Sequence, residues 1–144
     1  MVRAVAILAA VAAALLALPC AAAQWKQVQK GAVGELWVDS ASIKRLNGDV
    51  LFEYRIDYPK AQMEVGSKVT YQSTVTKAMV RCGTRTISIG PTTAYAGRGA
   101  SGKAVGTHPP DRDEARFQPV EPRSSDESLY HHVCGVAKVT PAAK

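Results

Sequence analysis

The segment from Ser124 to Cys134 constrains the fold of this 144-residue chain more than any other. Ser124 and Glu127 have the spacing of a capping box, in which each side chain satisfies a free backbone donor where a helix begins. The apolar side chains that follow recur at helical spacing, at Leu129, Tyr130, Val133 and Cys134. Gly135 comes next, and glycine favours the left-handed conformation that ends many helices. We therefore predict a C-terminal helix whose apolar stripe ends in a cysteine.

The first 23 residues have the pattern of a cleaved signal peptide. Arg3 supplies a positive charge, residues 4–18 form an uninterrupted apolar run, and residues 21–23 are three alanines. We expect cleavage after Ala23 and a mature chain that starts at Gln24. The apolar run is too short to favour a membrane span, so we predict no transmembrane segment in the mature chain.

A lipid anchor on Cys20 is an alternative outcome of export. Bacterial lipoprotein signals carry a small residue directly before the lipidated cysteine, and Pro19 occupies that position here. The sequence favours plain cleavage.

The length and charge of the mature chain limit its organisation and its partners. It suits one domain, expected over residues 24–138, with a flexible tail at 139–144. Loss of Arg3 lowers the formal net charge from +6 to +5. A basic balance favours acidic partners such as polyanionic glycans, acidic proteins or anionic lipid headgroups. Nucleic acid is not expected, because export removes that partner and the basic residues do not cluster.

Two cysteines, Cys82 and Cys134, remain once the leader is removed. An even pair in an exported protein is most simply one disulfide. It would close a loop of about fifty residues, worth roughly 4 kcal/mol in the chain-entropy model. Metal binding is the weaker interpretation, because neither cysteine has a CxxC or CxxH neighbour.

The middle of the chain has the alternation of β-strands. Asp49 to Tyr58 is the clearest case, with one apolar face, and Pro59 is expected to end it before a loop over 60–67. Further strands are expected at 25–30, 35–39, 68–82, 85–89, 92–96 and 117–120. A regular strand over 68–82 places Cys82 on the face opposite to that of Tyr71, unless a bulge lies between them.

Turn signals separate these strands. Residues 40–45 form a turn or a single helical turn, Asn47 and Gly48 form a turn, and Gly90 with Pro91 is expected to stop a strand. The stretch 96–106 is glycine-rich. Several strands followed by one helix predict an antiparallel α+β domain.

The segment from Gly97 to Lys103 resembles a phosphate-binding P-loop without matching it. It has the G-x4-G-K pattern, but Ala104 replaces the hydroxyl that holds magnesium, and no helix follows. We interpret it as a flexible hairpin tip. Its backbone amides, with Arg98 and Lys103, remain candidates for contact with an anionic ligand.

His131 and His132 suggest a metal or haem site. Adjacent helical residues point about 100° apart, so the two side chains cannot easily share one ion. Both lie off the apolar stripe, which favours solvated side chains; a surface contact with haem or zinc is the alternative. We predict no resident metal or cofactor, with haem as the one alternative.

The sequence does not favour catalysis. No G-x-S-x-G elbow accompanies its serines and histidines. The acidic run over 111–114 has the pattern of a solvated loop and not of a matched acid and base. Aromatic side chains on strands more often form a core than a binding face, an interpretation that applies to Trp25, Trp37, Tyr54, Tyr58 and Tyr71.

The mature sequence resembles the surface-adhesin protein E family of Gram-negative bacteria. The resemblance rests on the order of these pieces: Trp25 with Val28, residues 36–39, 42–45 and 50–58, Arg81 with Cys82, and residues 120–124 leading to Val133 and Cys134. It implies a twisted antiparallel sheet, with a C-terminal helix held on its concave side by a disulfide between Cys82 and Cys134.

The resemblance also implies a role at the bacterial surface, where members bind host matrix or plasma proteins; the type member is a lipoprotein for which dimers and haem binding are known. No ligand residue is carried over, because no binding motif of that member is present here. Our leading hypothesis is an exported, non-enzymatic adhesin-like binding module. The alternative is a soluble periplasmic protein, associated with the envelope or binding a small ligand.

Overall fold

The computed structural model describes residues 22–64 and 66–135, which form one antiparallel sheet and one α-helix. The strands lie in the order β1-β2-β4-β5-β6-β7, with β3 paired to β4 and β8 paired to β6. Their bounds are Trp25–Lys30 (β1), Glu35–Asp39 (β2), Lys44–Leu46 (β3), Asp49–Met63 (β4), Thr70–Arg81 (β5), Thr86–Tyr95 (β6), Ala104–His108 (β7) and Gln118–Pro119 (β8). Helix α1 spans Ser125–Cys134, and a 3-10 turn, η1, spans Arg98–Ala100. The α+β prediction is confirmed.

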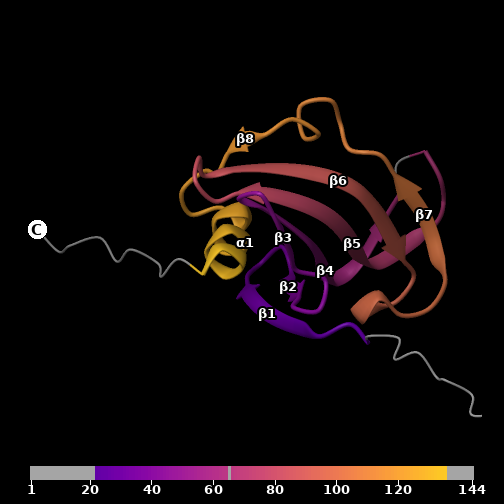
Figure 1. The fold of residues 1–144 in the computed structure, drawn as a ribbon. Coiled ribbons are helices and arrows are strands. Elements are labelled where there is room, and N and C mark those ends of the chain that lie inside the picture. The colour runs from indigo at the N-terminus through magenta and orange to yellow at the C-terminus, as the bar shows by residue number, and fades with distance from the viewer. Residues whose placement is uncertain (1–21, 65, 136–144) are drawn as a thin grey trace, which may run out of the picture.

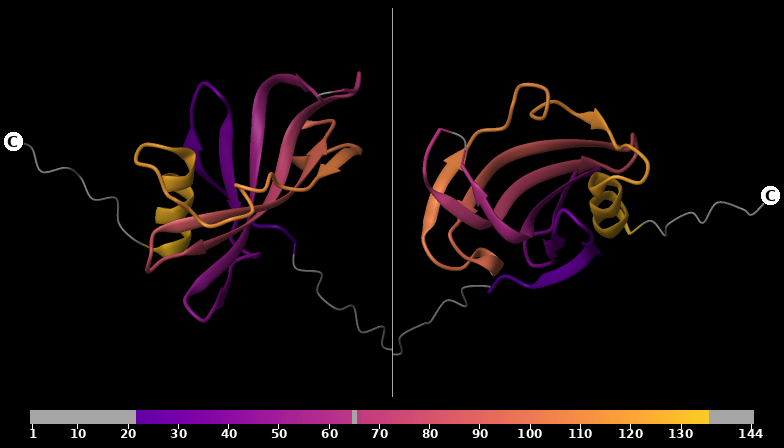
Figure 2. Two further views of the ribbon diagram at one scale, coloured as in Figure 1. Left: turned by 90° about the horizontal axis from the view of Figure 1, so that it is seen from above. Right: turned by 180° about the vertical axis from the view of Figure 1, so that it is seen from behind.

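The sheet is strongly curved. Figure 1 shows it curling from β1 round to β6, with α1 inside the curve at one end and β7 towards the other. The view from behind in Figure 2 shows the same arrangement. We call the side of the sheet that carries α1 the concave face and the opposite side the outer face.

The hydrophobic core lies between α1 and one half of the concave face. Strand alternation sends every second side chain of β4 and β5 to this face, and the register aligns them, with Val50 opposite Val80 and Phe52 opposite Ala78. Val38 and Val80 are fully buried. The buried core residues are Leu36, Val38, Val50, Phe52, Ala78, Val80, Ile87, Val120, Leu129, Tyr130 and Val133.

Helix α1 begins and ends where the sequence predicts. The Ser124 hydroxyl accepts a hydrogen bond from the Glu127 N–H at 3.1 Å, and Glu127 Oε2 accepts one from the Arg123 N–H at 2.7 Å. The glutamate side chain thus satisfies the backbone N–H of Arg123, the residue before the N-cap. Gly135 ends the helix with φ 67°, in the left-handed region that glycine tolerates.

A disulfide between Cys82 and Cys134 joins the end of α1 to the end of β5. Three further contacts hold the helix: the Tyr130 hydroxyl donates to the Cys82 carbonyl at 3.0 Å, Arg45 Nη2 donates to the Val133 carbonyl at 2.9 Å, and Arg85 pairs with Glu127. The predicted attachment of the helix to the face that carries Cys82 is confirmed.

Strand β4 does not end at Pro59, as the sequence analysis expected, but continues to Met63. Four residues of β4 lie between Asp57 and Gln62, opposite the single residue between Tyr71 and Ser73 on β5. Pro59 falls in this bulge, where its missing N–H leaves no ladder position empty. The expected loop over 60–67 therefore begins only after Met63.

Gly90 and Pro91 likewise do not divide β6, which was expected as two strands. Together they lie opposite the single residue Lys77 in a bulge. A Cβ on Gly90 would lie 2.8 Å from the Lys77 carbonyl oxygen, so glycine is required for this close approach. The bulge accommodates the proline without interrupting the strand.

Two short strands replace segments expected as turn or loop. The predicted turn over 40–45 gives way at Lys44 to β3, which pairs with β4. The glycine-rich stretch 96–106 contains the start of β7, which pairs with β6 and makes the 97–103 segment a hairpin connection.

The signal peptide and the tail at 139–144 lie outside the described residues, apart from Ala22 and Ala23, which are exposed. In the part of the chain that the structure describes, we find no helix with the length and apolar character needed to cross a membrane.

Candidate functional site

A cleft of about 410 Å³ opens on the concave face where the core ends. Ile87 belongs to both, so the cleft continues from the core along β4, β5 and β6. Its lining comprises Tyr54, Ile56, Tyr58, Tyr71, Thr74, Thr76, Ile87, Ile89, Thr92, Glu114, Gln118 and Asp126. Concave surfaces that combine apolar and aromatic side chains with polar groups are the usual form of a binding site.

Three tyrosines give the cleft its aromatic walls. The rings of Tyr58 and Tyr71 meet edge to face with their centroids 5.8 Å apart. Tyr54 lies deeper, and burial raises its pKa to about 12. A regular strand would place Tyr71 and Cys82 on opposite faces. Tyr71 instead lines the concave cleft together with Thr74 and Thr76. The bulge in β4 opposite this end of β5 explains the difference.

Two carboxylates come to the cleft from different segments of the chain. Asp126 is in the first turn of α1, whereas Glu114 belongs to the segment between β7 and β8. That segment is held along β6, because the Ile89 N–H donates to the Glu114 carbonyl at 2.8 Å and the Ser88 hydroxyl to the Ala115 carbonyl at 3.0 Å. Burial, and then the negative charge of Glu114, raise the pKa of Asp126.

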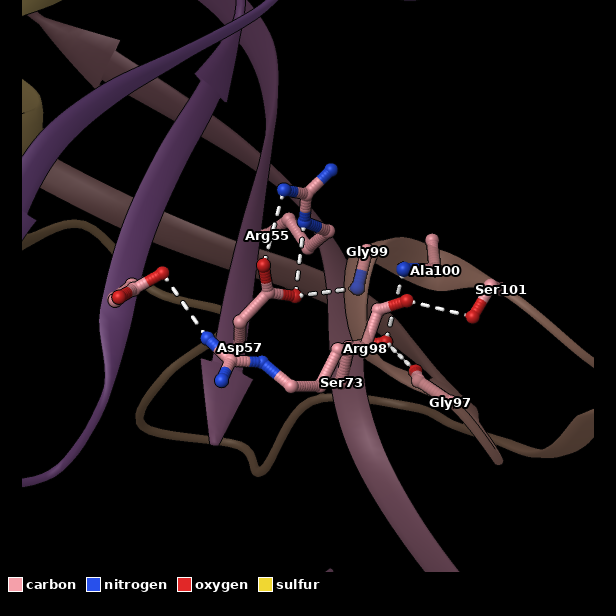
Figure 3. A network of polar contacts seen from close by, with 9 residues as sticks. Arg55, Asp57, Ser73, Gly97, Arg98, Gly99, Ala100 and Ser101 are labelled. Atoms are coloured by element: carbon pink, nitrogen blue, oxygen red, sulfur yellow. Dashed lines mark hydrogen bonds and ion pairs between the residues drawn. The ribbon is translucent and has the colours of Figure 1, made fainter. Parts of the chain in front are cut away.

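The outer face carries a different arrangement, centred on a buried ion pair. Arg55 Nη2 donates to Asp57 Oδ2 at 3.0 Å and Arg55 Nε lies 3.0 Å from Asp57 Oδ1 (Figure 3). The two residues are 6% and 5% exposed. The Arg55 guanidinium lies over two indole rings, 4.6 Å from the centroid of Trp25 and 5.1 Å from that of Trp37. These tryptophans therefore cover a buried charge and do not belong to the core beneath α1.

The glycine-rich hairpin tip is fastened to this ion pair (Figure 3). The Gly99 N–H donates to Asp57 Oδ1 at 2.8 Å, and the Ala100 N–H donates to the Ser73 hydroxyl at 3.0 Å. Ser73 in turn donates to the Gly97 carbonyl at 2.5 Å. Two amides that an external anion would need are thus already bonded to the protein's own oxygen atoms.

The predicted ligand residues of this hairpin lie apart from the cleft. Arg98 Nη2 forms an ion pair with Glu35 at 3.1 Å, and Lys103 is exposed. Their contact with an anionic ligand stays a prediction.

The two histidines of α1 differ from each other. His131 has a side chain only 8% exposed, 3.7 Å from Glu127 Oε1, and its ring meets that of Tyr130 edge to face. The expectation of a solvated side chain is therefore wrong for His131, because the helix rests against the sheet more broadly than its apolar stripe indicates. Partial burial, and then Lys26, lower the pKa of His132. Neither histidine lines the cleft.

Comparison with known proteins relates this geometry to a family. The family model for surface-adhesin protein E matches residues 25–135, which include every strand and α1. The chain belongs to the surface-adhesin protein E family. The resemblance of the sequence to that family is confirmed.

Solved structures of this family share the fold. Haemophilus influenzae protein E is 16% identical and superposes with a TM-score of 0.59, covering 77% of this chain and 83% of that one. Crystal form II of the same protein superposes with a TM-score of 0.60 at 16% identity, and the match covers 77% of this chain and 87% of that one. Protein E from non-typeable Haemophilus influenzae superposes with a TM-score of 0.58 at 16% identity, and the match covers 77% of this chain and 75% of that one. The search of curated proteins returned no match. At this identity the likeness shows the fold alone.

The carboxylates of the cleft were missed at the sequence level. The acidic run over 111–114 was assigned to solvent, and Asp126 had the ordinary place of an acid in a first helical turn. Nothing in the local sequence indicates that Glu114 and Asp126 face one cleft, because only the path of the segment along β6 brings them together. The tyrosines were identified, but their binding-face alternative was the weaker interpretation.

Proposed function

We propose that this protein is an exported, non-enzymatic binding module that acts as a surface adhesin toward host matrix or plasma proteins. The observation that carries the proposal is the family match over residues 25–135. The adhesin E family model spans the sheet, the helix and both cysteines of the disulfide, so the whole binding scaffold supports the proposal.

The geometry suits binding. The disulfide fixes α1 on the sheet, so the cleft has one rigid wall and one wall formed by the segment between β7 and β8. A preformed surface limits the ordering cost of association. The lining offers aromatic rings, hydroxyls and carboxylates.

The direct test is binding by the disulfide-bonded mature chain, residues 24–144. Immobilised host matrix and plasma proteins are exposed to it in solution, and association is followed by biolayer interferometry. Heat-denatured, reduced and alkylated protein is the control for unspecific contact. We expect saturable binding to at least one panel member that the control does not reproduce. Equal signals from the folded and the reduced protein across the panel would contradict the proposal.

A soluble periplasmic protein that binds a small ligand is the second candidate. The volume of the cleft, about 410 Å³, favours it, because that is the size of a small-molecule site. Cell fractionation separates the candidates: release with the periplasmic contents supports the second, and retention at the outer surface supports the first.

Haem is the one cofactor proposed for either candidate. Its contact would lie on α1, because His131 and His132 are outside the cleft. Hemin added to the protein should then shift the Soret band, and His132→Ala or His131→Ala should remove the shift. A spectrum equal to that of free hemin would contradict haem binding.

A further inference from the structure

The cleft has a local charge opposite to that of the whole protein. The chain has a formal net charge of +6. Among the residues that line the cleft, two are acidic, Glu114 and Asp126, and none is basic. A concave site lined by one sign of charge attracts ligand groups of the other sign. A cationic group is therefore favoured here, whereas the basic surface favours anions elsewhere.

One of these carboxylates lacks an internal partner. Within the described residues, the Asp126 side chain forms no hydrogen bond and no ion pair. Burial and the neighbouring negative charge of Glu114 raise the pKa of Asp126 above its ordinary value. A cation placed beside both carboxylates would oppose that rise.

The rest of the lining matches a long amphipathic side chain. The rings of Tyr58 and Tyr71 line the cleft and offer aromatic surface to an aliphatic stem. Three isoleucines supply an apolar surface for a methylene stem: Ile56, Ile87 and Ile89. Lysine and arginine combine such a stem with a charged head.

We propose that the cleft binds a lysine or arginine side chain presented by an extended peptide segment of a protein partner. The stem lies along the isoleucines and the tyrosine rings, and the charged head reaches Asp126 and Glu114. Thr74, Thr76 and Thr92 also line the cleft, where the Thr76 and Thr92 hydroxyls hydrogen-bond to each other at 2.8 Å. The inference rests on the proposed function, that the protein binds protein ligands, and adds the chemistry by which it selects them.

Nuclear magnetic resonance titration of the disulfide-bonded mature chain tests this. The probes are three capped tripeptides, Gly-Arg-Gly, Gly-Lys-Gly and Gly-Glu-Gly. We expect saturable amide shifts at Thr74, Thr76 and Thr92 with the two basic peptides, weakened by salt. The acidic peptide should produce none. Equal shifts from all three peptides overturn the inference. So does the absence of shifts with the basic peptides at about 10 mM, a concentration that detects even weak binding.

Variants of the two carboxylates test whether these groups bind the charged head of the basic peptides. Asp126→Asn and Glu114→Gln should each weaken binding of the basic peptides about fivefold, the usual effect of one partly exposed ion pair. Asp111→Asn is the matched control, since it lies in the same segment as Glu114 but outside the cleft lining, and should leave the affinity unchanged. Equal affinities for all three variants overturn the inference.

The matrix-protein assay separates failure of the inference from failure of the function. If the Asp126→Asn/Glu114→Gln variant binds the same panel member as strongly as the parent, the adhesin function stands and the cleft is not its site. If the parent binds the basic peptides but no panel member, the cleft chemistry stands and the adhesin function does not.

Discussion

Asp57 on β4 accepts a hydrogen bond from the Gly99 N–H at 2.8 Å, although 42 residues separate them along the chain. The same carboxylate pairs with Arg55, so one buried charge fastens the β6–β7 connection to the outer face. This relationship explains why a segment with most of a phosphate-binding pattern holds an internal carboxylate. It also fixes the position of this hairpin connection on the outer face.

Asp57→Asn should lower the free energy of unfolding by about 3 kcal/mol. The amide keeps the shape of the side chain but leaves the Arg55 charge buried without a counter-charge. Urea denaturation followed by circular dichroism measures the change. Asp111→Asn removes an exposed carboxylate and should change the stability by less than about 0.5 kcal/mol. Equal stabilities of the two variants would show that the ion pair is not structurally important.

Gly90→Ala should destabilise the protein by about 1–3 kcal/mol. The new Cβ would lie 2.8 Å from the Lys77 carbonyl oxygen, so the bulge in β6 must shift. Gly83→Ala is the matched control, because no atom lies within 4 Å of the Cβ that it would add. Thermal unfolding distinguishes them: a lower Tm for Gly90→Ala alone is expected, and identical values would contradict the close approach.

Loss of the disulfide should cost about 4 kcal/mol of stability. The Cys82–Cys134 bond spans 52 residues, and opening it restores freedom to the unfolded chain. The Cys82→Ser/Cys134→Ser variant should therefore unfold at a lower urea concentration and be insensitive to reductant. If reductant leaves the midpoint of the parent unchanged, the disulfide does not stabilise the domain.

The sequence predicted regular elements well and their interruptions poorly. Alternation along β4 and β5, and the Ser124 cap with Gly135 of α1, are local patterns, so they located the main strands and the helix. Pro59 and Gly90 were misjudged because each lies in a bulge, and the pairing of two distant segments decides whether a bulge forms. The proximity of Glu114 to Asp126 likewise depends on how distant segments pack in the folded protein.

The pH dependence of stability should report the titration of the partly buried Tyr54. Its folded-state pKa of about 12 lies above the unfolded value of 10.0. The folded state therefore keeps the proton where the unfolded state has lost it, so this contribution is complete below pH 10 and disappears as the pH rises to about 12.

Tyr54→Phe should remove that part of the alkaline loss, roughly 2–3 kcal/mol. Denaturant unfolding of both proteins across this pH range measures the difference. Parallel profiles for parent and variant would show that Tyr54 titrates as an ordinary tyrosine.

Protease shaving of intact cells tests the central claim, that the protein is displayed as a surface binding module, most directly. The segment between β7 and β8 offers the exposed trypsin sites Arg112 and Arg116. If the account is correct, trypsin added to intact cells removes the protein while a periplasmic marker stays intact. If the protein is degraded only after the outer membrane is permeabilised, the adhesin function is contradicted.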